Sequence, residues 1–384
     1  MAYTELRSSL ISKLSECEEV AVPGDETFYH GRLLTCRLDV PRVTWGSTAA
    51  PSPDMSDCPP WLTASELEDS PASLEVKVGG LLDLLRASRH TVLYAGAGLS
   101  TSSGVRQRGP GSCQPASRPR TTNAVPSPAH LLLSALVRAG LVQTWVTLSC
   151  DGLAQKAGCP QEAVLEVHGS WYDPSNPVLR KGGAIRPDIR ERLREEEETA
   201  DLVVVVGSSL TGSHPLVTKT STRASRGESL GSVIINLQET REDPGATLRL
   251  FSHSDTVAAL LARRLNIAVR EPDIRSNIQH RAWVNYSKEG VRTEPEGGMF
   301  LDLRPGQEVR LNNIHNWQNS RQPGVEHIRE GARGRVVKYC PTQRAWELQL
   351  EGAKMLLGYW WLGDSTSLTG PLHLPVVNWR PSYK

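Results

Sequence analysis

The 384-residue chain lacks closely spaced pairs of cysteines and long apolar runs. Its seven cysteines are scattered and none forms a Cys-x-x-Cys pair, which argues against a disulfide framework and against a four-cysteine zinc site. The apolar runs, Leu202–Val206 among them, are far too short to span a bilayer. The N-terminal residues include Glu5 and Glu16 and lack the apolar stretch of a secretory signal. We therefore expect an intracellular protein of the cytoplasm or nucleus, with reduced thiols and no membrane partner.

A strong net charge is missing as well. Lys and Arg total 43 against 42 Asp and Glu, so the formal net charge is +1. This balance argues against a histone-like polycation, an acidic tail and a mostly disordered chain. Nucleic acid is not an expected partner, because the chain has no basic surface signature interleaved with aromatic residues. Its length and its 39% hydrophobic content suit two or three domains with large buried cores.

One long stretch, residues 84–150, contains no lysine and no carboxylate. It does hold seven arginines: Arg86, Arg89, Arg106, Arg108, Arg118, Arg120 and Arg138. Because the stretch also contains a glycine-rich turn, this composition favours a bound polyanion such as the pyrophosphate of a dinucleotide. The alternative is a basic surface loop with no ligand.

Continuous apolar runs alternate with helical patterns over the middle of the chain. This alternation predicts the α/β class with a doubly wound parallel sheet, since strands buried on both faces read as unbroken apolar runs. We expect strands at Thr91–Ala95, Thr144–Leu148, Leu202–Val206 and Ser232–Ile235, and helices at Ala129–Ala139 and Thr256–Leu265.

Composition divides the chain into three predicted segments. Residues 1–75 read as an N-terminal extension rich in Pro and Ser, with one helix over Tyr3–Glu19, that packs on a neighbour or partner. Residues 76–268 form the α/β domain. Residues 269–384 show period-two alternation with glycine turns, which is typical of a small SH3-like β-barrel that docks proteins. The residues expected in its core are Val309, Val336, Trp346 and Leu348.

The glycine turn Gly96-Ala97-Gly98 follows the first predicted strand. Bare glycines let backbone N–H groups approach an anion, so this turn is a candidate phosphate site; a tight turn without a ligand is the alternative. The third glycine of the dehydrogenase fingerprint is replaced by Thr101, and no acidic residue follows before Asp151. A plain dehydrogenase is therefore excluded.

Eight motifs follow one another along residues 79–267. They are Gly96–Val105, Arg108-Gly109-Pro110, Pro126–Leu133, Thr147–Leu153 with Ala157-Gly158, Val164–Gly169, Gly182–Ile189, Asp201–Leu210 with Pro215, and Ile234-Ile235-Asn236. Their residues and order resemble the GAGxSxxxGI, RGP, PTxxHxxL, TQNIDGLHxxAG, VxExHG, GGxLRPDIV and DLVIVVGTSLxVxP elements, and the asparagine-bearing strand, of the sirtuin family of NAD-dependent protein deacylases. The resemblance covers about half of the chain.

The resemblance implies a chemistry in which NAD lies across the carboxyl edge of the sheet. An acyl-lysine oxygen attacks the ribose carbon as nicotinamide leaves, with His168 as the general base on the ribose hydroxyls. Asp151 and Ser149 would lie at the nicotinamide. The residues implied at the phosphates and riboses are Gly96, Ala97, Gly98, Ser100, Arg108, Gly207, Ser208, Ser209 and Asn236. Without this resemblance, His168 would read as a histidine satisfied in the core.

The chain departs from the family pattern at the reacting end of the site. The proline-aspartate-phenylalanine before the loop arginine is missing, and Ser149 replaces the asparagine that helps to position nicotinamide. Ser170–Lys181 contains no cysteine, so we expect no structural zinc. Trp171, Tyr172 and the Asp173–Pro177 turn are the predicted substitute for the zinc module.

These features predict a divergent sirtuin fold that binds NAD or ADP-ribose, with impaired deacylase activity on an acylated protein. Misplaced groups in a reacting pocket cost orders of magnitude in rate even when binding persists. One alternative is a catalytically dead scaffold subunit that docks in a larger assembly through its extension and barrel. Another is an NAD hydrolase or ADP-ribosyl transferase, since water can enter once the nicotinamide cover is lost.

Overall fold

The computed structural model describes residues 27–33, 38–53, 55, 57–106, 109–112, 121–180, 182–267, 269, 280–312, 320–321 and 324–379. The predicted helix Tyr3–Glu19 and the candidate site residue Arg108 lie outside these residues. None of the helices described is long and apolar enough to cross a membrane.

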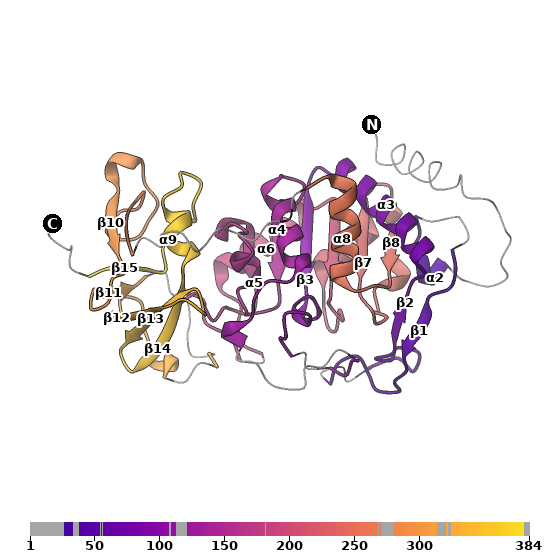
Figure 1. Ribbon diagram of the computed structural model, residues 1–384, viewed down its shortest axis with the longest axis horizontal. Coiled ribbons are helices and arrows are strands. Elements are labelled where there is room, and N and C mark those ends of the chain that lie inside the picture. Colours follow the sequence, from indigo (N-terminus) through magenta and orange to yellow (C-terminus); the bar gives the residue numbers. More distant parts are fainter. Residues whose placement is uncertain are drawn as a thin grey trace. The chain divides into compact units, whose positions relative to one another are not determined.

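The chain forms two compact units (Figure 1). The first comprises the described residues of Met1–Arg118, Pro126–Val146 and Arg192–Val269, and the second those of Pro119–Val125, Thr147–Glu191 and Arg270–Lys384. This division differs from the segments 1–75, 76–268 and 269–384, whose boundaries stay a prediction.

A parallel six-stranded sheet confirms the predicted α/β class. Its strand order is β5-β4-β3-β6-β7-β8. The strands are β3 (Thr91–Ala95), β4 (Thr144–Thr147), β5 (Val164–Glu166), β6 (Leu202–Val206), β7 (Gly231–Ile235) and β8 (Leu248–Leu250). Every residue of β3, β6 and β7 is buried, which explains their unbroken apolar runs. The order reverses between β3 and β6, and such a switch point is where open α/β sheets bind ligands.

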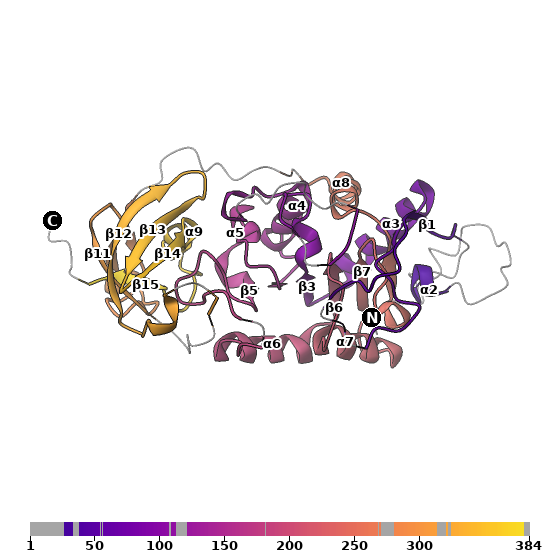
Figure 2. The same ribbon diagram turned by 90° about the horizontal axis from the view of Figure 1, so that it is seen from below.

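Helices cover both faces of the sheet in the first unit (Figure 2). On one face, α8 (Ser254–Leu265) packs against α3 (Pro71–Ala87) and α4 (Pro128–Arg138). On the other face, α7 (Pro215–Ser225) packs on β6 and β7. Helix α3 begins before residue 76 because Ser70 caps it, accepting a hydrogen bond from the Ser73 N–H.

The N-terminal extension packs on this same unit. It contains α2 (Thr27–His30), β1 (Arg42–Trp45) and β2 (Glu66–Glu68), and β1 pairs with β2 in antiparallel fashion. The Leu33 N–H donates to the Thr247 carbonyl at 2.8 Å, and the Leu67 N–H donates to the Leu237 carbonyl at 2.9 Å. The neighbour predicted for the extension is therefore the α/β fold of its own chain.

The C-terminal region of the second unit is antiparallel β-structure, as its alternation predicts. Its five-stranded sheet has the order β14-β13-β12-β11-β15, and β9 pairs with β10 beside it in the chain. The strands are β9 (Arg281–Val284), β10 (Met299–Asp302), β11 (Glu308–Leu311), β12 (Arg333–Cys340), β13 (Ala345–Leu350), β14 (Ala353–Gly358) and β15 (Val376–Asn378). The four predicted core residues are all buried. An SH3-like barrel stays a prediction.

The remaining helices among the described residues are short, apart from α6 (Pro187–Thr199), which is rich in arginine and glutamate. They are α5 (Leu153–Lys156), α9 (Trp360–Ser365) and the 3-10 turns η1 (Ala97–Ser100), η2 (Thr121–Asn123), η3 (Gln161–Ala163), η4 (Asp243–Gly245), η5 (Pro295–Gly297) and η7 (Val325–His327).

Candidate functional site

Two glycine turns meet where β3 and β6 end. The Gly98 N–H donates to the Gly207 carbonyl at 2.8 Å. A Cβ atom on Gly96 would lie 2.5 Å from the same carbonyl oxygen, so only glycine permits this approach. Gly207 itself has a φ of +60°, a conformation that glycine adopts without strain. The predicted residues of the two turns are therefore brought together at the switch point.

Polar side chains follow β6 and β7 at the same edge of the sheet. Ser208 is buried, and its Oγ accepts a hydrogen bond from the Leu210 N–H. Ser209 is half-buried, and its hydroxyl has no protein partner within the described residues. Asn236 donates through Nδ2 to the carbonyls of Ser208 and Gln238, at 3.3 and 3.1 Å, and its Oδ1 has no partner within that part of the chain. The Ser209 hydroxyl suits a phosphate or a ribose hydroxyl of a nucleotide, and Asn236 Oδ1, which only accepts, suits a ribose hydroxyl.

Ser100 lies in the same turn region but faces the interior. It is buried, and its Oγ lies 3.4 Å from Nε2 of the buried His130. The His130 Nδ1 in turn contacts Ser127 at the start of α4. Ser100 therefore links the glycine turn to α4.

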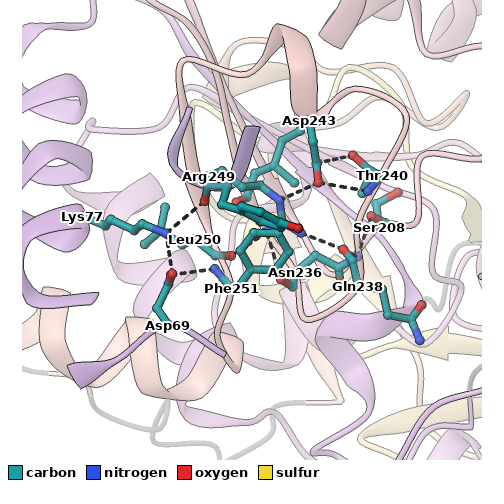
Figure 3. A network of polar contacts seen from close by, with 12 residues as sticks. Asp69, Lys77, Ser208, Asn236, Gln238, Thr240, Asp243, Arg249, Leu250 and Phe251 are labelled. Carbon is teal, nitrogen blue, oxygen red and sulfur yellow. Dashed lines mark hydrogen bonds and ion pairs between the residues drawn. The ribbon is translucent and has the colours of Figure 1, made fainter. Parts of the chain in front are cut away.

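A buried ionic network supports the segment that carries Asn236 (Figure 3). Arg249 is fully buried; its guanidinium donates to the Asn236 and Gln238 carbonyls at 2.9 and 2.7 Å and pairs with Asp243 at 3.0 Å. It also stacks 3.6 Å from the centre of the Phe251 ring. The fork of donors fixes the backbone on both sides of residue 237.

The second unit carries His168, Asp151 and Ser149. His168 is exposed, and its Nδ1 lies 3.2 Å from the Leu148 carbonyl oxygen. Because a carbonyl only accepts, Nδ1 carries the proton and Nε2 is the basic nitrogen of the neutral ring. This tautomer is the one that a general base acting through Nε2 requires.

Asp151 is buried, and both of its oxygens accept hydrogen bonds from its own segment. Oδ2 accepts from the Ser149 hydroxyl at 2.5 Å, and Oδ1 accepts from the Leu153 N–H at 3.0 Å. Ser149 thus turns toward Asp151. Gly152 follows with a φ of +64°, and a Cβ atom there would lie 2.7 Å from the Tyr172 ring. The segment is locked around the aspartate.

The predicted substitute for the zinc module is a tightly bonded turn. The Ser170 N–H donates to the Asn176 carbonyl at 2.7 Å, and Asn176 Nδ2 donates to the Glu166 carbonyl at 2.9 Å. Buried Asp173 accepts hydrogen bonds from the N–H and hydroxyl of Ser175, at 2.8 and 2.6 Å. Burial raises the pKa of Asp173, while the nearby Arg186 opposes this rise. Within the described ranges, no three His, Cys, Asp or Glu side chains gather as metal ligands.

Two buried carboxyl groups of the second unit have strongly raised pKa values. Burial raises the pKa of Glu166 to about 7, with the negative charge of Asp173 adding to the rise. Burial likewise raises the pKa of Asp364 to about 7, although its Oδ2 accepts from the Gln161 N–H at 2.9 Å. Both groups are therefore partly protonated near neutral pH.

The predicted site residues fall into two groups, one in each unit. The first unit holds Gly96, Ala97, Gly98, Ser100, Gly207, Ser208, Ser209 and Asn236, and the second holds Ser149, Asp151 and His168. Their roles stay a prediction. Sequence reasoning missed Arg249 and Gln238, because a buried arginine and a glutamine in a loop carry no recognisable spacing.

The comparisons with known proteins point to one family. No protein-family model matches the chain. It is 28% identical to the NAD-dependent protein deacetylase sirtuin-7 of Mus musculus over 256 residues, which are 53% of this chain and 63% of that protein. The chain thus spans less than two thirds of the length of that relative. A solved structure described as Sir2-p53 peptide-NAD+ is 28% identical, with 49% of this chain and 98% of that chain covered and a TM-score of 0.41.

An archaeal relative is more similar over a shorter stretch. The NAD-dependent protein deacylase 2 of Pyrobaculum aerophilum is 31% identical over 182 residues, which are 33% of this chain and 72% of that protein. Because identity above 30% extends over more than two thirds of this relative, the ordered motifs reflect common ancestry. The chain belongs to the sirtuin family of NAD-dependent protein deacylases.

Proposed function

We propose that this chain binds NAD or ADP-ribose at the carboxyl edge of its parallel sheet and that its protein-lysine deacylase activity is impaired. The observation that carries the binding proposal is the pair of oxygens at the switch point. Ser209 Oγ and Asn236 Oδ1 lie beside the contact between the Gly96 and Gly207 turns. Neither oxygen has a protein partner within the described residues. Dinucleotide phosphates and riboses need such donors and acceptors beside a close backbone.

The proposed chemistry places His168 as the general base. Bound NAD supplies the ribose carbon from which nicotinamide leaves. The Leu148 carbonyl holds the imidazole by its Nδ1–H, so that Nε2 accepts the proton of a ribose hydroxyl. An acylated lysine of a protein is the proposed substrate, and the cytoplasm or nucleus the proposed location.

The impairment follows from the hydrogen bonds of Asp151. Its oxygens already accept from Ser149 and Leu153, so fewer of its acceptor positions remain for a nicotinamide amide. Ser149 also lacks the amide that the family places at this position, and its hydroxyl is directed at Asp151. Loss of donors at a reacting centre costs about 10²–10³ in rate in other enzymes.

A scaffold role is the second candidate function, favoured by one surface feature. Trp283 and Phe300 face each other across β9 and β10, with ring centres 5.1 Å apart, and both side chains are about half exposed. Exposed tryptophans are common in protein interfaces. This pair would serve docking whether or not catalysis survives.

Calorimetric titration of NAD and of ADP-ribose tests the binding proposal. We expect both to bind the purified protein, and binding of neither would refute it. Nicotinamide release is then followed with and without an acetyl-lysine peptide, for the wild type and for His168→Ala. Slow release that requires the peptide and His168 supports impaired deacylation. Release without the peptide indicates an NAD hydrolase, and no release indicates a scaffold.

His253→Ala is the matched control for this experiment. His253 is also exposed, but it forms an ion pair with Glu68 of the first unit, whereas His168 contacts Leu148 in the second. Its replacement leaves both binding and release at wild-type values. An equal loss in both histidine variants would argue against a specific role for His168.

A further inference from the structure

The N-terminal extension contributes a buried carboxylate to the nucleotide-binding unit. Glu66 in β2 is 5% exposed, and its Oε1 accepts a hydrogen bond from the Ser112 N–H at 2.9 Å. The Ser112 hydroxyl donates to the other carboxylate oxygen. Hydrogen bonds to an ionised acceptor are the stronger kind. Glu66 therefore fixes the end of the Gly109–Ser112 segment, which directly follows Arg108 in the sequence.

A second anchor holds the same segment from the other side. Gln238 Nε2 donates to the Pro110 carbonyl at 2.8 Å and to the Ala64 carbonyl of the extension at 3.0 Å. Gly109 passes so close to the extension that a Cβ atom on it would lie 2.1 Å from the Pro51 carbonyl oxygen. The extension and the segment thus form one packed unit.

The anchors connect directly to the candidate ribose residue. Glu66 and Gln238 form an antiparallel bridge, and Gln238 accepts from Asn236 Nδ2 through its carbonyl. Arg249 donates to the carbonyls of Asn236 and Gln238 and so ties these two residues together (Figure 3). Glu66 thus binds Ser112, the Leu67 N–H donates to the Leu237 carbonyl, and Gln238 binds both Pro110 and Asn236, so that short bonded steps link the segment to Asn236.

We propose that Glu66 is a positioning residue for nucleotide binding: from the N-terminal extension, it orders Gly109–Ser112 against Gln238 beside Asn236, at the site proposed for NAD or ADP-ribose. This inference rests on the proposed function. Ordering the segment before the ligand arrives removes part of the entropic cost of binding.

Titration of ADP-ribose into Glu66→Ala, Glu66→Gln and Ser112→Ala tests the proposal. We expect the dissociation constant to rise about tenfold in Glu66→Ala, as loss of charge-assisted hydrogen bonds predicts. Glu66→Gln keeps an acceptor for the Ser112 N–H and gains a donor for its hydroxyl, so it binds within about threefold of the wild type. In Ser112→Ala we expect the ADP-ribose affinity to fall about threefold. The variant that carries both Glu66→Ala and Ser112→Ala binds no more weakly than Glu66→Ala alone.

Glu68→Ala is the control, since Glu68 lies on the same strand and contacts His253 instead. It binds ADP-ribose as the wild type does. The thermal unfolding midpoint without nucleotide is measured for each variant, and Ser112→Ala decides the matter if Glu66→Ala does not fold. If Glu66→Ala folds and binds ADP-ribose with wild-type affinity, the inference is wrong. If Glu66→Ala does not fold, wild-type affinity in Ser112→Ala overturns the inference instead. A wild type that binds neither nucleotide would instead refute the proposed function.

Discussion

The ammonium group of Lys156 donates a hydrogen bond to the Tyr172 hydroxyl at 2.7 Å, and both side chains are fully buried. The Tyr172 hydroxyl donates in turn to the Thr122 carbonyl at 2.6 Å. The Tyr172 ring lies 5.4 Å from that of Trp360, so it belongs to the same hydrophobic core as the C-terminal sheet. Tyr172 thus anchors its segment to the hydrophobic core of the C-terminal sheet.

Removing the Tyr172 hydroxyl destabilises the second unit. In Tyr172→Phe, the Thr122 carbonyl and the Lys156 ammonium each lose a buried partner, which costs about 1–3 kcal/mol of unfolding free energy. Chemical unfolding followed by tryptophan fluorescence measures the loss. Tyr339→Phe is the control, because the buried Tyr339 hydroxyl has no partner in the described part of the chain. Equal stability of the two variants would contradict this prediction.

The buried carboxyl of Glu166 makes stability depend on pH. Its pKa is about 7 in the folded chain and near its ordinary value when unfolded, so between these values the folded state holds a proton that the unfolded state has released. Its contribution is therefore present at low pH and is lost as the pH rises toward 7. Glu166→Gln removes the titrating group, so the variant lacks this part of the pH dependence of the unfolding free energy.

Thermal unfolding at pH 5.5, 6.5 and 7.5 tests the pH prediction. We expect Glu166→Gln to gain stability relative to the wild type as the pH rises through this window. Glu198→Gln removes an exposed carboxylate instead and leaves the pH dependence unchanged. A constant difference between wild type and Glu166→Gln would show that Glu166 does not titrate in this range.

Arg249 couples stability to nucleotide affinity. Arg249→Lys keeps a positive charge but loses the fork that reaches Asp243, Asn236 and Gln238, so it destabilises the first unit by about 3 kcal/mol. It also weakens ADP-ribose binding because Asn236 is no longer held. Unfolding and titration are compared with Arg226→Lys, an exposed position. If folded Arg249→Lys bound ADP-ribose with wild-type affinity, the Arg249 network would have no role in nucleotide binding.

We expect the purified protein to carry no structural zinc. Ser170–Lys181 contains no cysteine, and hydrogen bonds and aromatic packing hold its described residues. Elemental analysis gives well under one zinc per chain, and a strong chelator leaves the unfolding midpoint unchanged, whereas chelators denature zinc-dependent folds. One tightly held zinc per chain would refute this.

Much of the α/β fold could be predicted because its signals are local. The strands Thr91–Ala95 and Leu202–Val206 begin and end as their apolar runs predict, since strands buried on both faces must be continuously apolar. Strands β5 and β8 were missed, because three residues carry too little pattern to separate a strand from a turn.

The candidate site was predictable only in part. Glycines and polar residues at strand ends could be found by motif, because phosphate binding constrains neighbours in sequence. Arg249, Gln238 and Glu66 could not, since their roles depend on partners far away in the sequence, as with Glu66 and Ser112, which are 46 residues apart.

Local sequence patterns were sufficient to identify the family, the glycine turns, most of the apolar strands and the absence of cysteine from Ser170–Lys181. Each of these is written in residues that are neighbours along the chain. The packing of the extension on its own α/β unit and of Tyr172 in the C-terminal core became visible only in the three-dimensional contacts. Such contacts form between residues far apart in the sequence. The hydrophobic effect that drives them is non-directional and depends on the apolar area removed from water, so no short sequence motif predicts them.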